Sequence, residues 1–302
     1  MRHAGQGPQT AGGPRRAPGG VAQPAPEAPA TTGAPDSEAL DTEALDAESA
    51  VGADAVIDAG TGQRSWRALV YQLVGILAVL LGLVGWLLVA ELSPAELTTL
   101  APAALWAHTL EHLQLTLLSA AIVLAVAIPL GVALTRKSLR FLSGPVLVVA
   151  NVGQAAPSIG LVVLLAFWLG FGFWAAVIAL VLYGVLPVLR NTMVGLQHVD
   201  QRLVEAGRGM GMTAAAVLFK VELPMAVPIM LAGIRTALVL LVGPAALATF
   251  INGGGLGILI TTGVQLNLPA VLVVGSLLVA LLALFIDWVG RVVEHVARPK
   301  GL

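Results

Sequence analysis

The chain has 302 residues, of which 57% are hydrophobic and only 11% charged, with a net charge of −1 at pH 7. Its apolar residues gather into runs of about 20, the length that a helix needs to cross a bilayer. The composition therefore excludes a soluble globular protein, and the lack of cysteine excludes disulfides and thiol chemistry. We expect the lipid bilayer, and no nucleic acid, as a partner.

Residues 1–65 differ from the rest of the chain in composition. Ala, Gly, Pro and Thr dominate there, and large apolar side chains are nearly absent. Such a segment buries too little apolar surface to offset the entropy of folding, so we expect a disordered cytoplasmic tail. No apolar core follows its early arginines, so it is not expected to be a secretory signal.

Six apolar segments follow, and they predict an all-α integral membrane protein with about six transmembrane helices. They are Leu69–Ala90, Leu113–Leu134, Pro145–Leu169, Phe173–Val194, Met225–Ile251 and Leu268–Val289. The first, within residues 66–92, has no proline and is expected to be a peripheral helix. Prolines and polar residues in the second to fifth spans are tolerated where helices face each other or a wet cavity, so we expect a bundle around a path.

Lysine and arginine are distributed unevenly between the connections that join these spans. They occur in every connection on one side, whereas the three on the other side, near residues 91–112, 170–172 and 252–267, have none. Because positive residues favour the cytoplasmic side, this pattern predicts a multi-pass protein of the cell (plasma or inner) membrane with both termini cytoplasmic.

The segment 197–224 is then a cytoplasmic loop between the fourth and fifth spans. Asp200 and Thr213 are suited to cap two short helices, separated by the glycine-rich stretch 207–211. Pro224 is expected to end the second helix. This helix would carry an apolar ridge that needs a cover, made by Val217, Leu218 and Val221.

This loop resembles the cytoplasmic signature of binding-protein-dependent ABC importer permeases. The signature has Glu-Ala-Ala, then Gly, Ile and Leu-Pro at fixed spacings, and the chain departs from it with Gly for the second Ala and Val for Ile. The matching residues are Glu205, Ala206, Gly207, Gly211, Val221, Leu223 and Pro224. The resemblance covers about residues 105–295 and implies a type I ABC importer permease core, in which the loop is a coupling helix that docks on an ATPase subunit.

Other strings are similar to the osmoprotectant branch of these permeases, which carry glycine betaine, choline, carnitine and related quaternary amines. They are "NVGQAAPSIGLVVLL" (151–165), "EAGRGMGM" (205–212), "LAGIRTALV" (231–239) and "FINGGGLG" (250–257). The resemblance implies a transport subunit with no catalytic residue and no cofactor of its own, because ATP and Mg bind the partner ATPase. It also implies an external substrate-binding protein and a second permease, either another copy or a related chain. A permease for another small solute, such as an amino acid, is the alternative.

Four residues of the third span are candidates for the translocation path: Asn151, Gln154, Pro157 and Ser158. Polar groups at mid-membrane depth are costly enough to suggest a function, although Asn and Gln also join neighbouring helices. Both interpretations stay open. Arg235 is a basic residue expected inside the fifth span, and we expect it to pair within the bundle.

The pentapeptide "HTLEH" supports a hypothesis of a different class. His108 and His112 share a helix face with Glu111 between them, as in certain zinc proteases. The third ligand would have to be Glu91 or Glu96, because the other histidines lie on the opposite side of the membrane. A membrane zinc metallopeptidase is therefore the alternative class, although a five-residue match arises easily by chance.

Overall fold

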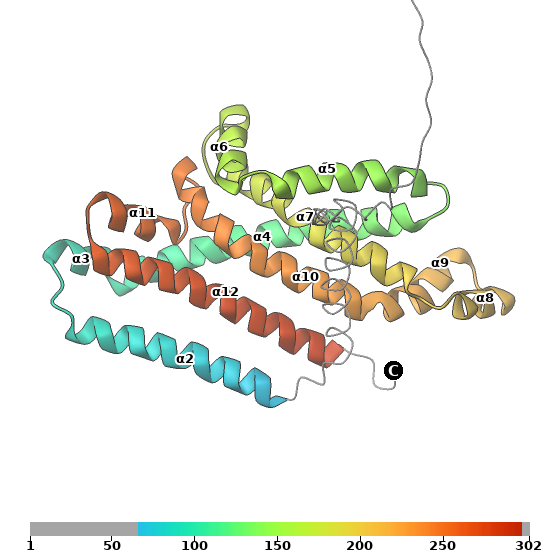
Figure 1. Ribbon diagram of the computed structural model, residues 1–302, viewed down its shortest axis with the longest axis horizontal. Coiled ribbons are helices and arrows are strands. Elements are labelled where there is room, and N and C mark those ends of the chain that lie inside the picture. Colours follow the sequence, from blue (N-terminus) through green and yellow to red (C-terminus); the bar gives the residue numbers. More distant parts are fainter. Residues whose placement is uncertain (1–65, 298–302) are drawn as a thin grey trace, which may run out of the picture. The chain divides into compact units, whose positions relative to one another are not determined.

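The computed structural model describes residues 66–297, and this part of the chain is a bundle of helices without strands (Figure 1). Five long helices are apolar enough to cross a membrane. They are α2 (Trp66–Val89), α4 (Pro102–Thr135), α7 (Phe173–Gln197), α10 (Leu223–Ala245) and α12 (Pro269–Ala297). The expected all-helical membrane fold is confirmed, and the predicted tail 1–65 lies outside the described residues.

The third predicted span is not one straight helix. It consists of α5 (Ser143–Ala155), entered through the 3₁₀ turn η1 (Arg140–Leu142), and α6 (Ser158–Leu169), and the pair is bent by 101°. The bend follows from Pro157, because a proline disfavours the helical conformation of the residue before it, and Ala156 is indeed extended with ψ 139°. The six expected spans are recovered only if this bent pair counts as one.

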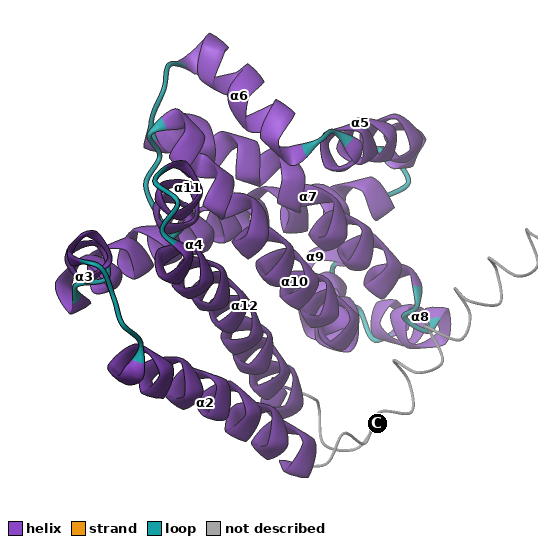
Figure 2. Ribbon diagram, turned by 60° about the vertical axis from the view of Figure 1, so that its left-hand side comes forward, coloured by secondary structure: helices purple, strands orange, loops and turns teal. Residues whose placement is uncertain are grey.

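The helix α7 lies at the centre of the bundle and α2 at its edge (Figure 2). Helices α4 and α10 both pack along α7, α12 packs on α10, and α2 packs on α12. Of the most apolar stretch of each helix, 56% is buried in α7 but only 11% in α2. Within the described chain, α2 therefore has little contact with the rest of the bundle.

Close crossings at α7 depend on two glycines. A Cβ at Gly131 of α4 would lie 2.9 Å from the Thr192 side chain, and one at Gly233 of α10 would lie 2.4 Å from Cβ of Asn191. Both distances are shorter than real Cβ contacts, so only glycine allows these backbones to approach. Small residues serve the same purpose at many helix contacts in membranes.

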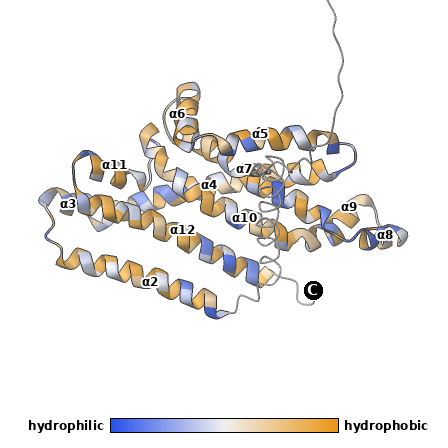
Figure 3. Cartoon of the chain, in the orientation of Figure 1, coloured by the Kyte–Doolittle hydropathy of each residue, from blue (hydrophilic) through white to orange (hydrophobic). Residues whose placement is uncertain are grey.

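Short helices gather at the end of the bundle opposite the loop 197–224. They are α3 (Pro94–Thr99), the 3₁₀ segment η3 (Ala246–Ile251) and α11 (Gly257–Gln265). Figure 3 shows apolar residues along the long helices and hydrophilic residues on α8, at the other end. Apolar residues along the long helices suit the hydrocarbon of a bilayer, and the hydrophilic residues of α8 suit the water beyond it.

Glu96 ties the helix α3 to the start of α12. Its carboxylate accepts hydrogen bonds from the backbone and the hydroxyl of Ser93, both at 2.9 Å, and from the backbone N–H of Ala270 at 3.2 Å. Ser93 in turn caps α3 through the backbone N–H of Glu96, which completes a capping box. These donors, first of all the backbone N–H of Ser93, hold the pKa of Glu96 below its usual value of 4.5.

This lowered pKa predicts a pH-dependent contribution to stability. A carboxyl group with a depressed folded-state pKa stabilises the fold fully above its unfolded-state value, 4.5, and loses that contribution as the pH falls through the folded-state pKa. Wild type is therefore expected to be more stable than Glu96→Gln at neutral pH, and the difference should shrink below pH 4.5. Thermal unfolding of both proteins across this range measures it. A difference that stayed constant with pH would contradict the ionised link.

Arg235 pairs with acidic residues of α12, as expected. Its guanidinium lies 2.8 Å from a Glu294 oxygen and 3.7 Å from an Asp287 oxygen. Asp287 also accepts from Arg291 at 2.7 Å and from Gln72 of α2 at 3.0 Å. A further hydrogen bond, from Trp288 to the Leu69 carbonyl, is 2.9 Å long. The charges balance within the network, so α2, α10 and α12 are joined by polar groups that are satisfied away from water.

Candidate functional site

The loop 197–224 begins with an amphipathic helix, α8 (Gln201–Gly209). Asp200 caps it as predicted, because its side chain accepts from the backbone N–H of Arg202 at 2.9 Å. Val204 and Gly207 face inward and are buried, whereas Glu205 and Ala206 are exposed. Gly207 does not break the helix as expected. Its role is steric, because a Cβ there would lie 3.3 Å from Sδ of Met212 and 3.4 Å from Val217.

The turn after α8 is made by Gly211, whose φ of +80° favours glycine. Thr213 then caps the next helix, α9 (Ala214–Val217), through the backbone N–H of Ala216. Both capping residues were therefore predicted correctly.

Pro224 does not end the second helix of the loop. A wide π turn, η2 (Leu218–Glu222), leads directly from α9 into α10, and Pro224 lies in the first turn of α10. A proline has no N–H to donate, and its ring presses on the carbonyl four residues earlier in a regular α-helix. The wider π turn relieves both problems, so the helical path continues across the proline.

The predicted apolar ridge is covered by the chain itself. Val217 is 1% exposed and packs with Val199 and Val204, while Met212 and Val221 lie against the same cluster. Other apolar side chains of the loop are exposed, although no sequence pattern singled them out: Leu203 at 44%, Met210 at 76% and Phe219 at 66%. These three, like Glu205 and Ala206, are exposed on the loop. Of the other predicted loop residues, Val221 and Leu223 are half-buried and Pro224 is exposed.

An ion pair fixes the loop to the end of α4. Both terminal nitrogens of the Arg136 guanidinium donate to the two carboxylate oxygens of Glu222, one of them at 3.2 Å. The Glu222 side chain is 9% exposed and that of Arg136 is 35% exposed. Sequence reasoning missed this pair because its members are 86 positions apart and belong to different connections between spans.

The four candidate path residues lie together at the bend between α5 and α6. Asn151 and Pro157 are exposed, and Gln154 and Ser158 are half-buried. Among the described residues, neither Asn151 nor Gln154 has a side-chain hydrogen-bond partner, so they do not join neighbouring helices of this chain. Two unsatisfied amides at this depth are costly unless they face water or another protein.

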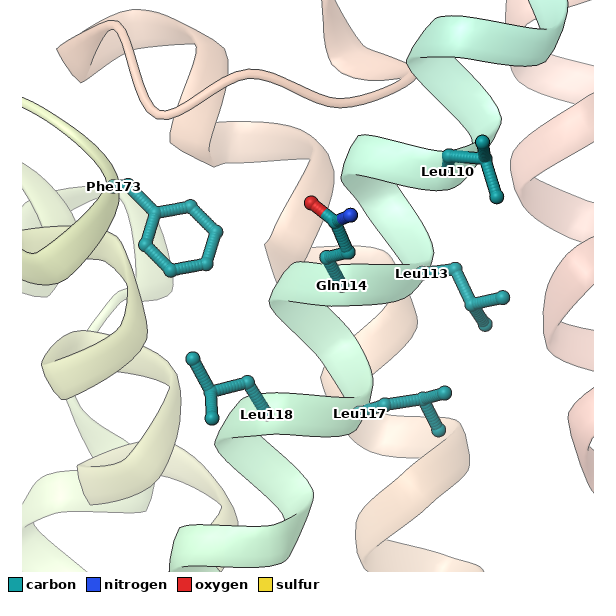
Figure 4. Close-up of a pocket in the computed structure, with 6 residues that line it drawn as sticks. All are labelled: Leu110, Leu113, Gln114, Leu117, Leu118 and Phe173. Atoms are coloured by element: carbon teal, nitrogen blue, oxygen red, sulfur yellow. The ribbon is translucent and has the colours of Figure 1, made fainter.

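A hollow of about 410 Å³ lies between α4 and the start of α7 (Figure 4). Its lining is apolar except for one amide: Leu110, Leu113, Gln114, Leu117, Leu118 and Phe173. Gln114 and Phe173 face this hollow, and neither was predicted as a site residue. The lining offers no charged group, so it has little chemistry with which to select a polar solute.

The histidines of "HTLEH" do not form a metal site. His112 is fully buried, its Nε2 lies 3.0 Å from the Val242 carbonyl, and its Nδ1 accepts from the backbone of Leu256 at 3.3 Å. Glu111 accepts from the backbone of Gly255 at 3.0 Å. The two side chains hold the glycine-rich connection between η3 and α11, and no cluster of three metal-ligating residues exists within residues 66–297. Glu96, proposed as a third ligand, is engaged with Ser93 and Ala270.

Comparison with known proteins shows the family of this chain. Residues 127–298 match the model for the binding-protein-dependent transport system inner membrane component, so the chain belongs to this family. It is a permease subunit of an ABC importer, and its relatives are named as transport permeases rather than enzymes. Permeases of this kind are inner-membrane proteins that work with an ATPase and a substrate-binding protein.

Several curated relatives cover most of the same region. A glycine betaine/carnitine/choline transport system permease of Bacillus subtilis (strain 168) is 43% identical, over 64% of this chain and 88% of that protein. A choline transport system permease of the same strain is 41% identical, over 64% of this chain and 88% of that protein. An osmoprotectant import permease of Salmonella typhimurium is 39% identical, over 64% of this chain and 92% of that protein.

Solved structures share the fold. An inward-facing methionine ABC transporter matches with a TM-score of 0.56 and 25% identity, over 65% of this chain and 96% of that chain. An amino acid ABC transporter solved with histidines matches with a TM-score of 0.56 and 18% identity, over 68% of this chain and 99% of that chain. At this low identity, the match shows only that the fold is shared.

Proposed function

We propose that this permease belongs to an importer of small quaternary-amine osmoprotectants, such as glycine betaine, choline or carnitine. The relatives named for these solutes are 39–43% identical to the chain over about two thirds of its length. An amino acid is the second candidate solute, supported by the structural likeness to a methionine transporter at 25% identity. The higher identities favour the quaternary amines.

The loop 197–224 is, in this proposal, the surface on which the ATPase docks. The observation that supports it is an exposed glutamate among exposed apolar side chains of the same loop: Glu205 and Leu203 lie on the capped helix α8, Met210 directly follows it, and Phe219 lies on η2. Such a mixture of apolar anchors and polar groups is typical of protein interfaces. ATP and Mg would bind the ATPase, so this chain would need no cofactor.

The same proposal assigns the remaining partners and the orientation. Both termini would be cytoplasmic, because the basic residues lie on the side of the loop 197–224. The external binding protein would meet the opposite end, where α3, η3 and α11 lie (Figure 1). A second permease, either another copy or a related chain, would complete a path lined by Asn151, Gln154, Pro157 and Ser158, whose amides lack partners within the described chain.

A purification from the native host tests the assembly. The tagged chain, extracted in mild detergents, is expected to bring an ATPase and an external binding protein with it, which mass spectrometry identifies. Uptake into proteoliposomes that contain this complex then tests the solute, with labelled glycine betaine, choline and carnitine against methionine and histidine. Uptake of an amino acid alone would overturn the assignment to quaternary amines, and a chain that is always recovered alone would overturn the proposed assembly.

Replacing Glu205 by arginine is expected to abolish ATP-driven uptake without affecting membrane insertion. The side chain is exposed, so the change costs little folding free energy, but it reverses the charge at the proposed docking surface. Glu91→Arg is the matched control for recovery of the ATPase, because Glu91 is an exposed glutamate at the end of the bundle opposite this loop. Recovery of the ATPase with the tagged variant and uptake per permease are measured together. Normal values of both for Glu205→Arg would show that the ATPase docks elsewhere.

A further inference from the structure

A second, polar cavity of about 720 Å³ lies beside the loop 197–224. Its walls come from the end of α4 with the turn that follows it, from the end of α7 with α8, and from Glu222 of η2. It is thus formed by three separate parts of the chain, and the Arg136–Glu222 ion pair is part of its lining. The proposed transport function uses Glu205 of this lining but none of its basic residues.

The lining carries an excess of positive charge. Four basic residues, Arg136, Lys137, Arg140 and Arg208, face two acidic ones, Glu205 and Glu222. Arg136 and Glu222 neutralise each other. Within residues 66–297, Lys137, Arg140 and Arg208 form no ion pair, although they share one cavity. Like charges gathered in a concave site repel one another and attract an anion.

One wall of the cavity has the composition of a membrane–water boundary. The turn after α4 places Lys137 and Arg140 next to apolar side chains that are exposed, namely Leu139 at 39%, Phe141 at 73% and Leu142 at 37%. Exposed apolar groups beside basic ones are typical of segments that lie among lipid head groups. The turn also follows directly on the apolar helix α4, so its basic residues lie where lipid phosphates are found.

We propose that this cavity binds a phosphate group, held by Lys137 and Arg140 from one wall and by Arg208 from the other. Basic pockets between helices on the cytoplasmic side of a membrane are suited to anionic head groups. The phosphate belongs either to an anionic phospholipid or to a free phosphate ion, and the chemistry of recognition is the same. Because Arg208 lies on α8, the bound group links the turn after α4 to the loop 197–224.

The test uses the complete importer in nanodiscs and has two arms. In the first, phosphatidylglycerol is added in increasing proportion to phosphatidylcholine, and native mass spectrometry counts the phosphatidylglycerol molecules that each permease retains. In the second, the nanodiscs contain phosphatidylcholine only, and inorganic phosphate is titrated while ³¹P NMR follows its binding. The cavity variant is Lys137→Gln with Arg140→Gln. The control, Arg67→Gln with Arg190→Gln, removes the same charge from exposed residues outside the cavity.

We expect saturable binding in one arm, which identifies the source of the phosphate. Each basic residue near a charged membrane surface contributes a factor of about five in affinity, so the cavity variant should bind about 25-fold more weakly. Arg208→Gln, from the opposite wall, should bind about fivefold more weakly. This second variant tests the cavity independently, in case the double variant binds weakly because it is misfolded. The control should bind like wild type.

Three results would overturn the proposal. The first is no saturable binding in either arm, and the second is an equal loss of binding in the cavity variant and the control. The third is binding by the permease freed of its ATPase but not by the assembled importer, which would identify an acidic segment of the ATPase as the occupant. All three rest on binding alone, so they are independent of the transported solute.

Discussion

Arg136→Met is expected to lower the midpoint of thermal unfolding by about 5–10 °C and to impair uptake. The substitution leaves the Glu222 carboxylate almost buried without its partner, and breaking such a pair costs several kcal/mol. Because the Arg136 side chain keeps 35% exposure, we take about 2–3 kcal/mol, below the usual range for fully buried pairs. Thermal unfolding of the purified complex and uptake per permease are the measurements.

The double variant Arg136→Met with Glu222→Leu separates the ion pair from its surroundings. Replacing both partners by apolar residues removes the unpaired charge, so most of the lost stability should return. Arg67→Met is the matched control, since Arg67 is exposed and unpaired in the described structure. If the two single changes simply added in the double variant, the two side chains would not act as a pair.

Gly233→Ala is expected to destabilise the protein by about 2 kcal/mol, although alanine is the better helix former. The added Cβ would lie 2.4 Å from Cβ of Asn191 and 2.8 Å from the Pro187 carbonyl, so α10 must move away from α7. The crossing of these two helices lies at the centre of the bundle. Thermal unfolding of the purified variant gives the change in stability.

Gly243→Ala is the matched control for this prediction, because it lies in the same helix. A Cβ at Gly243 meets no atom within 4 Å, so the substitution should be neutral or stabilising by up to about 1 kcal/mol. The two alanines are therefore expected to act in opposite directions. Equal effects would mean that the close approach at Gly233 does not limit the packing of α7 and α10.

Local patterns predicted the features that depend on neighbouring residues. The apolar runs predicted the membrane spans. Asp200 and Thr213 predicted where both helices of the loop 197–224 begin, because a cap depends only on the next three residues. The resemblance singled out Gly211, whose positive φ makes the turn, whereas the role of Glu205 stays a prediction. These features need no knowledge of the rest of the fold.

Features that depend on distant contacts were left open, predicted wrongly or missed. Val217 was expected to need a cover, and Val199 and Val204 supply it once the chain folds back. Pro224 was expected to end a helix, yet the helical path continues through a π turn into α10, with Pro224 in the first turn of α10. The Arg136–Glu222 pair joins residues that no local pattern relates. Tertiary packing decided each case.

The π turn at 218–222 has a mechanical consequence. Because it replaces the expected break, the chain from Ala214 to Ile251 is one continuous helical segment of 38 residues, about 57 Å along its path. The segment ends at the glycine-rich connection that Glu111 and His112 hold, so a displacement of α9 is passed along helical backbone to that connection. A movement of the loop 197–224 would thus reach the opposite end of the bundle.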